Sequence, residues 1–539
     1  MRMRVFEFLA VGAALGLASK VERVVDLGYA KYKGRSVGDG TTQWLGMRYA
    51  APPLGELRFR APVDPLPSKP NTIQDASKFG NICLAQSPDD WTYKPTKRFT
   101  VGEDCLFVNV FAPEGKKKGL PVMFFIQGGG FTSNSNANAN GSDLARIGDM
   151  VVVSINYRVG PYGFLMGDEV VNGGGSTNNG IRDQLKALEW TKKHVSKFGG
   201  DPNHIILNGA SAGATSIVIL MGSPSVKGRK LFKGVIAEST ALVQLKTLEE
   251  GQVQYDCLAK AAGCSGNSSL ECLRKANTTA LLTKACNFSP SSDKDILPSP
   301  LLMNAAYADT LRNTPSIFGT TADEGTDFAP NTTNSTAEFR GILAYIAPFL
   351  SSSALDGLVE MYASGPQPAF PNVGNYWRAT SNAYGDIAFK CPTRAYAGQS
   401  SWVYDWVVPD PEDEASGSGA YHTVEKHAIW GPNNTDGNPP KSYRPGGVNA
   451  GVVPLMQGYV TSFVRWLDPN VGRAEGAPRW EKAKDGKTLR IGGVSGSGVG
   501  SLEEVEGKGF AERCKRLRPV LGALEVTPPA GTKVDLAEG

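Results

Sequence analysis

The sequence predicts an α/β fold with a large, mostly parallel central sheet and helices on its faces. Two apolar runs, in residues 119–131 and 149–158, are typical of fully buried strands, and the first of them ends in three glycines. Residues 178–202 then carry a helical pattern of apolar and charged residues, and a third strand follows at 204–209. A sharp turn leads into an apolar helical segment at 211–222, and this alternation of strands and helices indicates a parallel sheet.

The flanking segments extend this pattern without dividing the chain. Residues 37–62 predict short strands followed by a proline-rich connection. From about residue 240 polar loops dominate, until a short strand in 316–328 ends in an acidic turn. Two helical segments and one strand are predicted after that turn, at 342–350, 354–364 and 401–408. Since no linker, repeat or long low-complexity tract occurs, we expect one domain over residues 19–539.

Composition and charge argue against several classes of function. The 539 residues are 41% hydrophobic and 20% charged, with a formal net charge of +4. No concentrated basic face is evident, so we expect no nucleic-acid partner. Beyond the first residues no run of about 20 apolar residues occurs, so we expect no membrane anchor.

The amino terminus and the cysteines predict a secreted, extracellular protein. Arg2 and Arg4 precede an apolar run, and the small residues before Ser19 predict removal of residues 1–18 as a signal peptide. The eight cysteines are an even number, as expected for disulfides formed in an oxidising compartment. Asn287 is a weak glycosylation acceptor because of Pro290. The stronger candidates are Asn140, Asn267, Asn277, Asn331, Asn334 and Asn433.

Ser211 lies between Gly209 and Gly213 in a G-x-S-x-G pattern. The pattern alone is weak, because 63 residues of the chain are glycine. Its position is more informative, since it falls at the predicted strand-to-helix turn. There the glycines leave room for a strained backbone that exposes the hydroxyl, and the following helix supplies N–H groups. We therefore expect Ser211 to be a nucleophile that needs a histidine base and a carboxylate.

Four histidines are candidates for the base. His194 lies on a predicted helix, where we expect it at the surface, and His204 starts a strand far from the serine. His422, on a loop after a late strand, fits the chain order serine, acid, histidine, while His427 remains an alternative. The residues alone do not choose the acid among three carboxylates in one turn: Asp323, Glu324 and Asp327.

Gly128, Gly129 and Gly130 follow the first buried strand. Without side chains, their backbone N–H groups can face a negatively charged oxygen, so we interpret this segment as an oxyanion-binding loop. The alternative is a flexible turn with no chemical role.

Several motifs in the same order show that the sequence resembles the type-B carboxylesterase and lipase family. This is the cholinesterase-like branch of the α/β-hydrolases, and the chain resembles a secreted fungal member of it. The resemblance covers nearly all of the expected mature chain and implies the α/β-hydrolase fold. The motifs are FRAP, EDCLFVNVFAP, QGGGF, NYRVGPYGFL, NNGIRDQLKALEW, FGGDPNHIILNGASAGA, DEGTDF and GAYHTVE.

The resemblance implies a role for each matching residue. Ser211 matches the nucleophile, Glu324 the acid and His422 the base. The oxyanion hole would consist of the N–H groups of Gly129, Gly130 and Ala212, and neither a cofactor nor a metal is implied.

Two positions depart from the family pattern. Ala210 stands where the family often has glutamate or another residue with a side-chain handle, and Gln127 where it often has histidine or tyrosine. Both departures suggest a pocket of different polarity from that of the family's best-known members.

The resemblance also implies three disulfides. These pair Cys83 with Cys105, Cys264 with Cys272, and Cys391 with Cys514. Cys257 and Cys286 are left over, and no motif indicates whether they pair.

Together these observations predict a secreted serine hydrolase that cleaves carboxylic esters through an acyl-enzyme. We expect soluble short-to-medium acyl or aryl esters as substrates, because residues 84–104, where family lipases carry an amphipathic lid, are few and polar. One alternative is a true lipase or sterol esterase acting on water-insoluble esters. Another is a non-catalytic, cholinesterase-like adhesion domain. The sequence leaves the oligomeric state open.

Overall fold

The structure is a computed structural model of the chain. It describes residues 23–90, 98, 100–115, 118–242, 244–266, 268–293, 295–297, 305–398, 400–484, 487–492, 501–504, 507–526, 528, 529 and 531–538. The expected signal peptide, the glycosylation candidate Asn267 and part of the segment between Cys83 and Cys105 lie outside the described residues.

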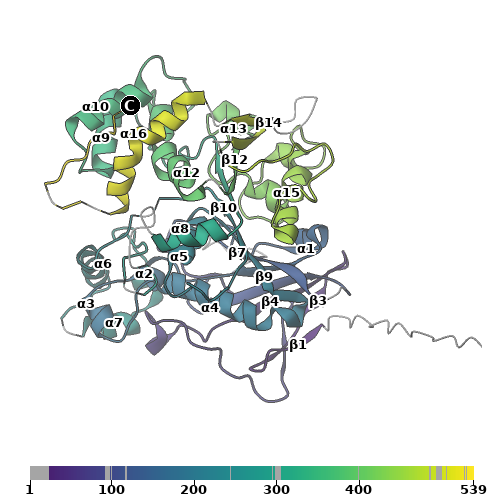
Figure 1. The fold of residues 1–539 in the computed structure, drawn as a ribbon. Coiled ribbons are helices and arrows are strands. Elements are labelled where there is room, and N and C mark those ends of the chain that lie inside the picture. Colours follow the sequence, from purple (N-terminus) through teal and green to yellow (C-terminus); the bar gives the residue numbers. More distant parts are fainter. Residues whose placement is uncertain are drawn as a thin grey trace, which may run out of the picture.

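In the described part of the chain, a sheet of 11 strands runs through the molecule (Figure 1), in the order β14-β13-β12-β11-β10-β9-β7-β8-β6-β4-β3. The strands from β13 to β8 in this order are parallel: β13 (Lys487–Gly492), β12 (Trp402–Val407), β11 (Ser316–Thr321), β10 (Gly234–Glu238), β9 (Gly200–Ala210), β7 (Leu120–Ile126) and β8 (Val151–Ile155). Antiparallel strands extend both edges: β14 (Ser501–Glu504) on one side, and β6 (Phe107–Pro113), β4 (Thr41–Arg48) and β3 (Arg35–Ser36) on the other. The predicted large, mostly parallel sheet is confirmed.

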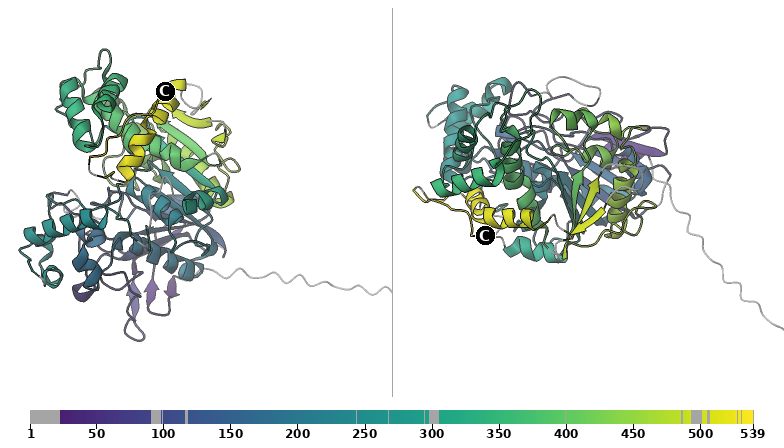
Figure 2. Two further views of the ribbon diagram at one scale, coloured as in Figure 1. Left: turned by 60° about the vertical axis from the view of Figure 1, so that its left-hand side comes forward. Right: turned by 90° about the horizontal axis from the view of Figure 1, so that it is seen from above.

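A second, three-stranded sheet consists of β1 (Val24–Asp26), β2 (Lys31–Lys33) and β5 (Ile73–Asp75). Its strands form the purple ribbons at the lower end of the molecule in the left view of Figure 2.

Helices cover both faces of the main sheet because successive strand side chains point to opposite faces. On one face, Phe124 and Leu207 belong to a core with α4 (Asn179–His194) and α5 (Ala212–Gly222). On the other face, Phe125 and Ile206 belong to a core with α1 (Ser142–Gly148) and α15 (Val452–Trp466). The helices predicted in 178–202 and 211–222 correspond to α4 and α5.

A third core joins three helices that lie together in Figures 1 and 2: α9 (Thr336–Ile346), α10 (Ser352–Ala363) and α16 (Gly507–Glu525). The remaining α-helices are α2 (Gly160–Phe164), α3 (Asp168–Asn172), α6 (Leu248–Ala261), α7 (Ser269–Lys275), α8 (Ala305–Asn313), α11 (Trp377–Gly385), α12 (Cys391–Ala397), α13 (Pro411–Ser416) and α14 (Lys426–Trp430). A π-helical turn, Asp386–Lys390, joins α11 to α12.

All eight cysteines are bonded in the structure. The pairs are Cys83–Cys105, Cys257–Cys286, Cys264–Cys272 and Cys391–Cys514. The first, third and fourth are the pairs implied by the resemblance, and the second joins the two cysteines that no motif assigned.

The candidate glycosylation sites differ in exposure. Asn277, Asn331, Asn334 and Asn433 are exposed. Asn140 is half-buried, and its amide donates a hydrogen bond of 3.0 Å to Asn434 Oδ1. A glycan on Asn140 would have to replace this bond. In the part of the chain that the structure describes, no helix is both long and apolar enough to cross a bilayer.

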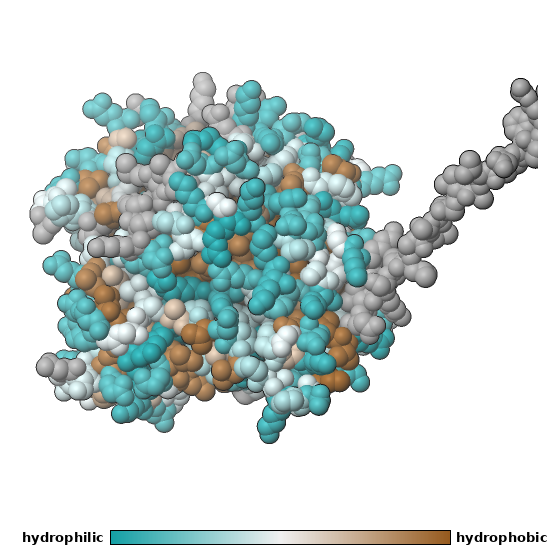
Figure 3. Space-filling model, turned by 60° about the horizontal axis from the view of Figure 1, so that its bottom comes forward, coloured by the Kyte–Doolittle hydropathy of each residue, from teal (hydrophilic) through white to brown (hydrophobic). Residues whose placement is uncertain are grey.

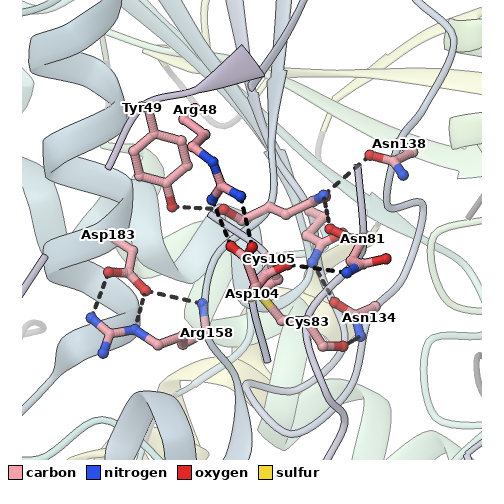
Figure 4. The surroundings of a disulfide bond; sticks show 12 residues. Arg48, Tyr49, Asn81, Cys83, Asp104, Cys105, Asn134, Asn138, Arg158 and Asp183 are labelled. Carbon is pink, nitrogen blue, oxygen red and sulfur yellow. Dashed lines mark hydrogen bonds and ion pairs between the residues drawn. A yellow bond between two sulfur atoms is a disulfide. The ribbon is translucent and has the colours of Figure 1, made fainter. Parts of the chain in front are cut away.

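A buried ion pair ties the end of β8 to α4 (Figure 4). The Arg158 guanidinium donates two hydrogen bonds of 2.7 Å to the Asp183 carboxylate, and the Arg158 backbone N–H donates a third of 3.1 Å. The Arg158 side chain is 3% exposed and that of Asp183 is not exposed at all. Removing one partner would leave the other charge buried without compensation.

We expect Asp183→Ala to lower the free energy of unfolding by about 3–5 kcal/mol, because Arg158 would then be a buried, unpaired cation. Urea denaturation of the two proteins measures the difference. The control is Lys275→Ala, which removes an exposed pair with Glu271 at 3.0 Å and should leave the midpoint nearly unchanged. Equal effects of the two substitutions would contradict a stabilising role for the buried pair.

Candidate active site

Ser211 occupies a sharp turn between β9 and α5. Its φ of +56° lies in the left-handed region that residues other than glycine rarely adopt. Both neighbouring glycines are required sterically. A Cβ atom on Gly209 would lie 2.6 Å from the Gly213 carbonyl carbon, and one on Gly213 would lie 2.1 Å from the Ile126 oxygen. The G-x-S-x-G pattern therefore reflects close backbone approach on both sides of the serine.

His422 and Glu324 form a hydrogen-bonded pair. Glu324 follows β11, is fully buried, and accepts a bond of 2.8 Å from the Thr321 N–H through Oε1. Its Oε2 accepts a bond of 2.5 Å from His422 Nδ1. The buried Nε2 of His422 has no hydrogen-bond partner among the described residues. A proton held at Nδ1 leaves Nε2 as the basic nitrogen of the ring.

The other two carboxylates of the acidic turn have different surroundings. Asp323 makes an ion pair of 2.7 Å with Arg378 Nη1, and its Oδ2 accepts a bond of 2.9 Å from the Ala420 N–H. It therefore fixes the loop two residues before His422. Asp327 is exposed. Of the three, Glu324 is the one whose carboxylate binds His422 in the structure.

The remaining histidines are engaged elsewhere. His427 is buried with Nδ1 2.6 Å from Thr435 Oγ1, and burial lowers its pKa to about 2. His204 Nε2 lies 2.8 Å from the Val464 oxygen, to which it donates. The surface position expected for His194 is wrong, because its ring packs against Tyr29 and Trp190 and is only 6% exposed.

The glycine loop rests directly on the serine turn. A Cβ atom on Gly128 would lie 3.1 Å from Ser211 Cβ and 2.7 Å from the Ala210 oxygen. Gly129 and Gly130 have φ values of +110° and +61°. Position 129 could hold no side chain, since a Cβ atom would lie 2.2 Å from the Ser133 oxygen.

The Gln127 side chain connects this loop to the Cys83–Cys105 disulfide through Asn134. Its fully buried side chain donates a bond of 2.8 Å to Asn134 Oδ1, and Asn134 in turn donates one of 2.8 Å to the Cys83 oxygen. Figure 4 shows Asn134 beside the Cys83–Cys105 disulfide. The disulfide therefore anchors the loop. The Gln127 side chain is thus buried and bonded to Asn134, and the different pocket polarity expected from positions 127 and 210 stays a prediction.

Aromatic side chains surround His422. The Phe328 and Phe389 rings lie 5.1 Å and 4.4 Å from the imidazole, and Tyr384 stacks on Phe328 at 5.2 Å. Phe328 belongs to the DEGTDF motif, whereas Tyr384 and Phe389 lie in a segment without a motif, and sequence reasoning missed all three. They form an aromatic wall beside the histidine, and Tyr384 also borders an apolar space.

That space is a cavity of about 200 Å³ next to Tyr384. Its lining includes Leu242, Leu343, Ile346, Ile387, Val520 and Leu524. Leu242 belongs to the segment that follows β10, and the preceding Ala241 oxygen accepts a bond of 2.9 Å from Thr215 in the first turn of α5. One wall of the cavity is thus connected to α5 four residues after Ser211. An outer hollow shares the Tyr384, Thr380, Ile342 and Ile346 side chains.

Among the described residues, no group of three or more His, Cys, Asp or Glu side chains is arranged to hold a metal ion. The arrangement of Ser211, His422, Glu324 and the glycine loop suits acyl transfer, in which a hydroxyl attacks a carbonyl and backbone N–H groups stabilise the oxyanion.

Both the sequence and the fold are similar to those of known proteins. A sequence profile of the carboxylesterase family matches residues 21–496. The chain is 33% identical to the para-nitrobenzyl esterase of Bacillus subtilis (strain 168), across 77% of this chain and 84% of that protein. It is 29% identical to secreted lipase 4 of Gibberella zeae, across 84% and 85%. The crystal structure of EstA from Aspergillus niger superposes with a TM-score of 0.84 and 34% identity, covering 93% of this chain and 99% of that one. The α/β-hydrolase fold expected from the sequence is confirmed.

We expect Gly128→Ala to slow organophosphonate labelling of Ser211 by about 10²-fold, comparable to the loss of one oxyanion donor. The added methyl group would push the loop away from the serine turn. Mass spectrometry of the labelled protein follows the rate. The matched control is Gly522→Ala, at a position with nothing within 4 Å of the new Cβ atom. Equal labelling rates would show that the loop's contact with the turn has no effect on reactivity.

Proposed function

The chain belongs to the carboxylesterase family and is a carboxylic ester hydrolase, and from this membership we propose that Ser211, His422 and Glu324 are its catalytic triad. One observation carries the proposal. His422 is hydrogen-bonded through Nδ1 to a fully buried carboxylate, while its Nε2 has no partner among the described residues. This is the state in which an imidazole can accept the proton of a serine hydroxyl.

The reaction proceeds in two acyl transfers. His422 Nε2 takes the Ser211 proton as the serine oxygen bonds to the ester carbonyl carbon, and Glu324 stabilises the imidazolium. The N–H groups of Gly129, Gly130 and Ala212 bind the oxyanion of the tetrahedral intermediate. The alcohol leaves with the proton from His422, and an acyl-enzyme remains. Water, deprotonated by His422, then attacks the acyl carbon, and the acid is released from Ser211.

The mature enzyme is secreted as one domain over residues 19–539, after removal of the signal peptide. The four disulfides support this localisation, since such bonds persist in oxidising compartments. Relatives named secreted lipases support it as well. N-linked glycans are carried on exposed acceptors: Asn277, Asn331, Asn334 and Asn433.

The substrates are soluble esters with a short-to-medium acyl chain or an aryl group. The apolar cavity beside Tyr384 has room for a short alkyl chain but is only about 200 Å³. On the face drawn in Figure 3, hydrophobic residues form separate groups among hydrophilic ones. Relatives named lipases favour the second candidate, an enzyme for water-insoluble esters.

Ser211→Ala should lower kcat for p-nitrophenyl acetate by roughly 10⁴- to 10⁶-fold, because the nucleophile is removed. A fluorophosphonate should modify the wild-type protein once, on the peptide that contains Ser211. The control is Ser223→Ala, at the other end of α5, where the buried hydroxyl has no partner among the described residues. Retained hydrolysis by Ser211→Ala, with no labelling of wild type at this residue, would sink the triad assignment.

Ile346→Trp should lower kcat/KM for p-nitrophenyl octanoate by about 10-fold and leave the acetate nearly unchanged, because the indole would fill the cavity that holds the longer chain. Tyr345→Ala is the control, since Tyr345 is 88% exposed and lines only the outer hollow. The octanoate rate should rise smoothly through the micelle threshold. A sharp rise at that threshold would favour the lipase candidate.

A further inference from the structure

Two buried glutamates that the proposed mechanism does not use lie on the same face of the sheet as Ile206. Glu238 is the last residue of β10, and Glu425 is the residue before α14. Neither side chain is exposed at all. A buried ionised carboxylate without a partner is strongly unfavourable, so two of them on one face call for a physical explanation.

The register of the sheet brings the two side chains toward one point. Glu238 pairs with Gly319 of β11, and Gly319 pairs with Tyr404 of β12. Tyr404 fills the space over Gly319, since a Cβ atom there would lie 2.3 Å from the Tyr404 hydroxyl oxygen. That hydroxyl donates a bond of 3.0 Å to Glu425 Oε1. The carboxyl of Glu425 therefore lies over the paired residues Gly319 and Tyr404, which are next to Glu238 in the sheet.

Each carboxyl has one satisfied and one unsatisfied oxygen. Glu238 Oε1 accepts a bond of 2.5 Å from Asn208 Nδ2, and Glu425 Oε1 accepts the Tyr404 bond. The Oε2 atoms of both glutamates are buried and have no partner among the described residues. A proton on either Oε2 would supply the donor that the other lacks.

The two glutamates are also attached to different parts of the candidate site, Glu238 to the serine turn and Glu425 to the loop that carries His422. The Glu238 oxygen accepts a main-chain bond of 2.8 Å from the Ser211 N–H. Glu425 lies three residues after His422, and its oxygen accepts the Ala428 N–H at 2.9 Å in the first turn of α14. A bond between the carboxyls would thus join the serine turn to the histidine loop.

We propose that Glu238 and Glu425 share a proton, and that this carboxyl pair is a positioning device which holds Ser211 and His422 in register. The proposal rests on the proposed function, because it assigns a task to residues outside the proposed triad. When the last shared proton leaves, two like charges repel each other beside the buried Glu324, and the two halves of the site separate.

The electrostatics agree in direction with a shared proton. Burial raises the pKa of Glu238 to about 7, against the opposing effects of Asn208 and Lys426. Burial also raises the pKa of Glu425 well above its usual value, and the charges of Glu238 and Glu324 raise it further. The ionisable groups that face the pair from neighbouring elements are Glu324, Tyr404, Tyr421, Lys426 and Tyr443.

The sign of the pH effect follows from these directions. A carboxyl whose pKa is raised in the folded state binds its proton more tightly there than in the unfolded chain. Its contribution to stability is complete below the ordinary value of 4.5 and is lost as the pH rises to about 7 for Glu238. Activity should decline on the alkaline side for the same reason, as the pair loses its proton.

Profiles of kcat/KM against pH for wild type, Glu238→Gln, Glu425→Gln and the double variant test the proposal. In Glu238→Gln the side-chain amide can donate to Glu425 at every pH. We therefore expect the alkaline limb of this variant's profile to move up by about one pH unit or more. The double variant should show no further shift. Asp410→Asn is the matched control, a buried carboxyl whose two oxygens already accept bonds of 3.1 Å and 2.8 Å. Its alkaline limb should stay in place.

Infrared difference spectra of the resting proteins give a readout independent of ester hydrolysis. Wild type at neutral pH should show the C=O stretch of a protonated carboxyl, and this band should be lost in both single variants. An alkaline limb that does not move in Glu238→Gln, or a missing band in wild type, would overturn the pair. If wild type neither hydrolyses esters nor reacts with a fluorophosphonate at Ser211, the proposed function fails while the infrared test of the pair still stands.

Discussion

The close approach of Gly213 to the Ile126 oxygen is the contact on which the arrangement of the site depends. A Cβ atom at residue 213 would lie 2.1 Å from that oxygen, so α5 can reach the end of β7 only because this residue has no side chain. The approach holds Ser211 in a left-handed backbone conformation. It also brings the glycine loop, which continues from β7, against the serine. A larger residue at 213 would move the helix outward and separate Ser211 from the loop.

The residues of the candidate active site all follow carboxyl ends of parallel strands, which meet at one edge of the sheet. The glycine loop follows β7, Ser211 follows β9, Glu324 follows β11 and the loop with His422 follows β12. Main-chain bonds connect these ends laterally, from Ser211 to Glu238 and from Ala322 to Trp406. The backbone of the sheet therefore brings together groups that lie far apart in the sequence, and side-chain bonds such as that of Asp323 to the Ala420 N–H only refine their positions.

Much of this could be predicted from the sequence because the central strands are continuous apolar runs, and the serine turn carries its glycines at the required spacing. The choice of acid could not be made from the residues alone, since three carboxylates share one turn and only their directions in space distinguish them. The burial of His194 could not be predicted from its helix alone, since Tyr29, from a distant segment, covers it. The pairing of Cys257 with Cys286 and the contact of Phe389 with His422 depend likewise on contacts that involve a segment without a motif.

The contact between Gly319 and Tyr404 limits how this protein can change over generations. The tyrosine ring occupies the place of any side chain at 319, so even alanine there would collide with the ring. Loss of the tyrosine would in turn remove the donor to Glu425 Oε1 and open a void over β11. Gly319 and Tyr404 can therefore be replaced during evolution only if both residues change together. The two sites should covary, and substitutions at either one alone should be rare among functional descendants.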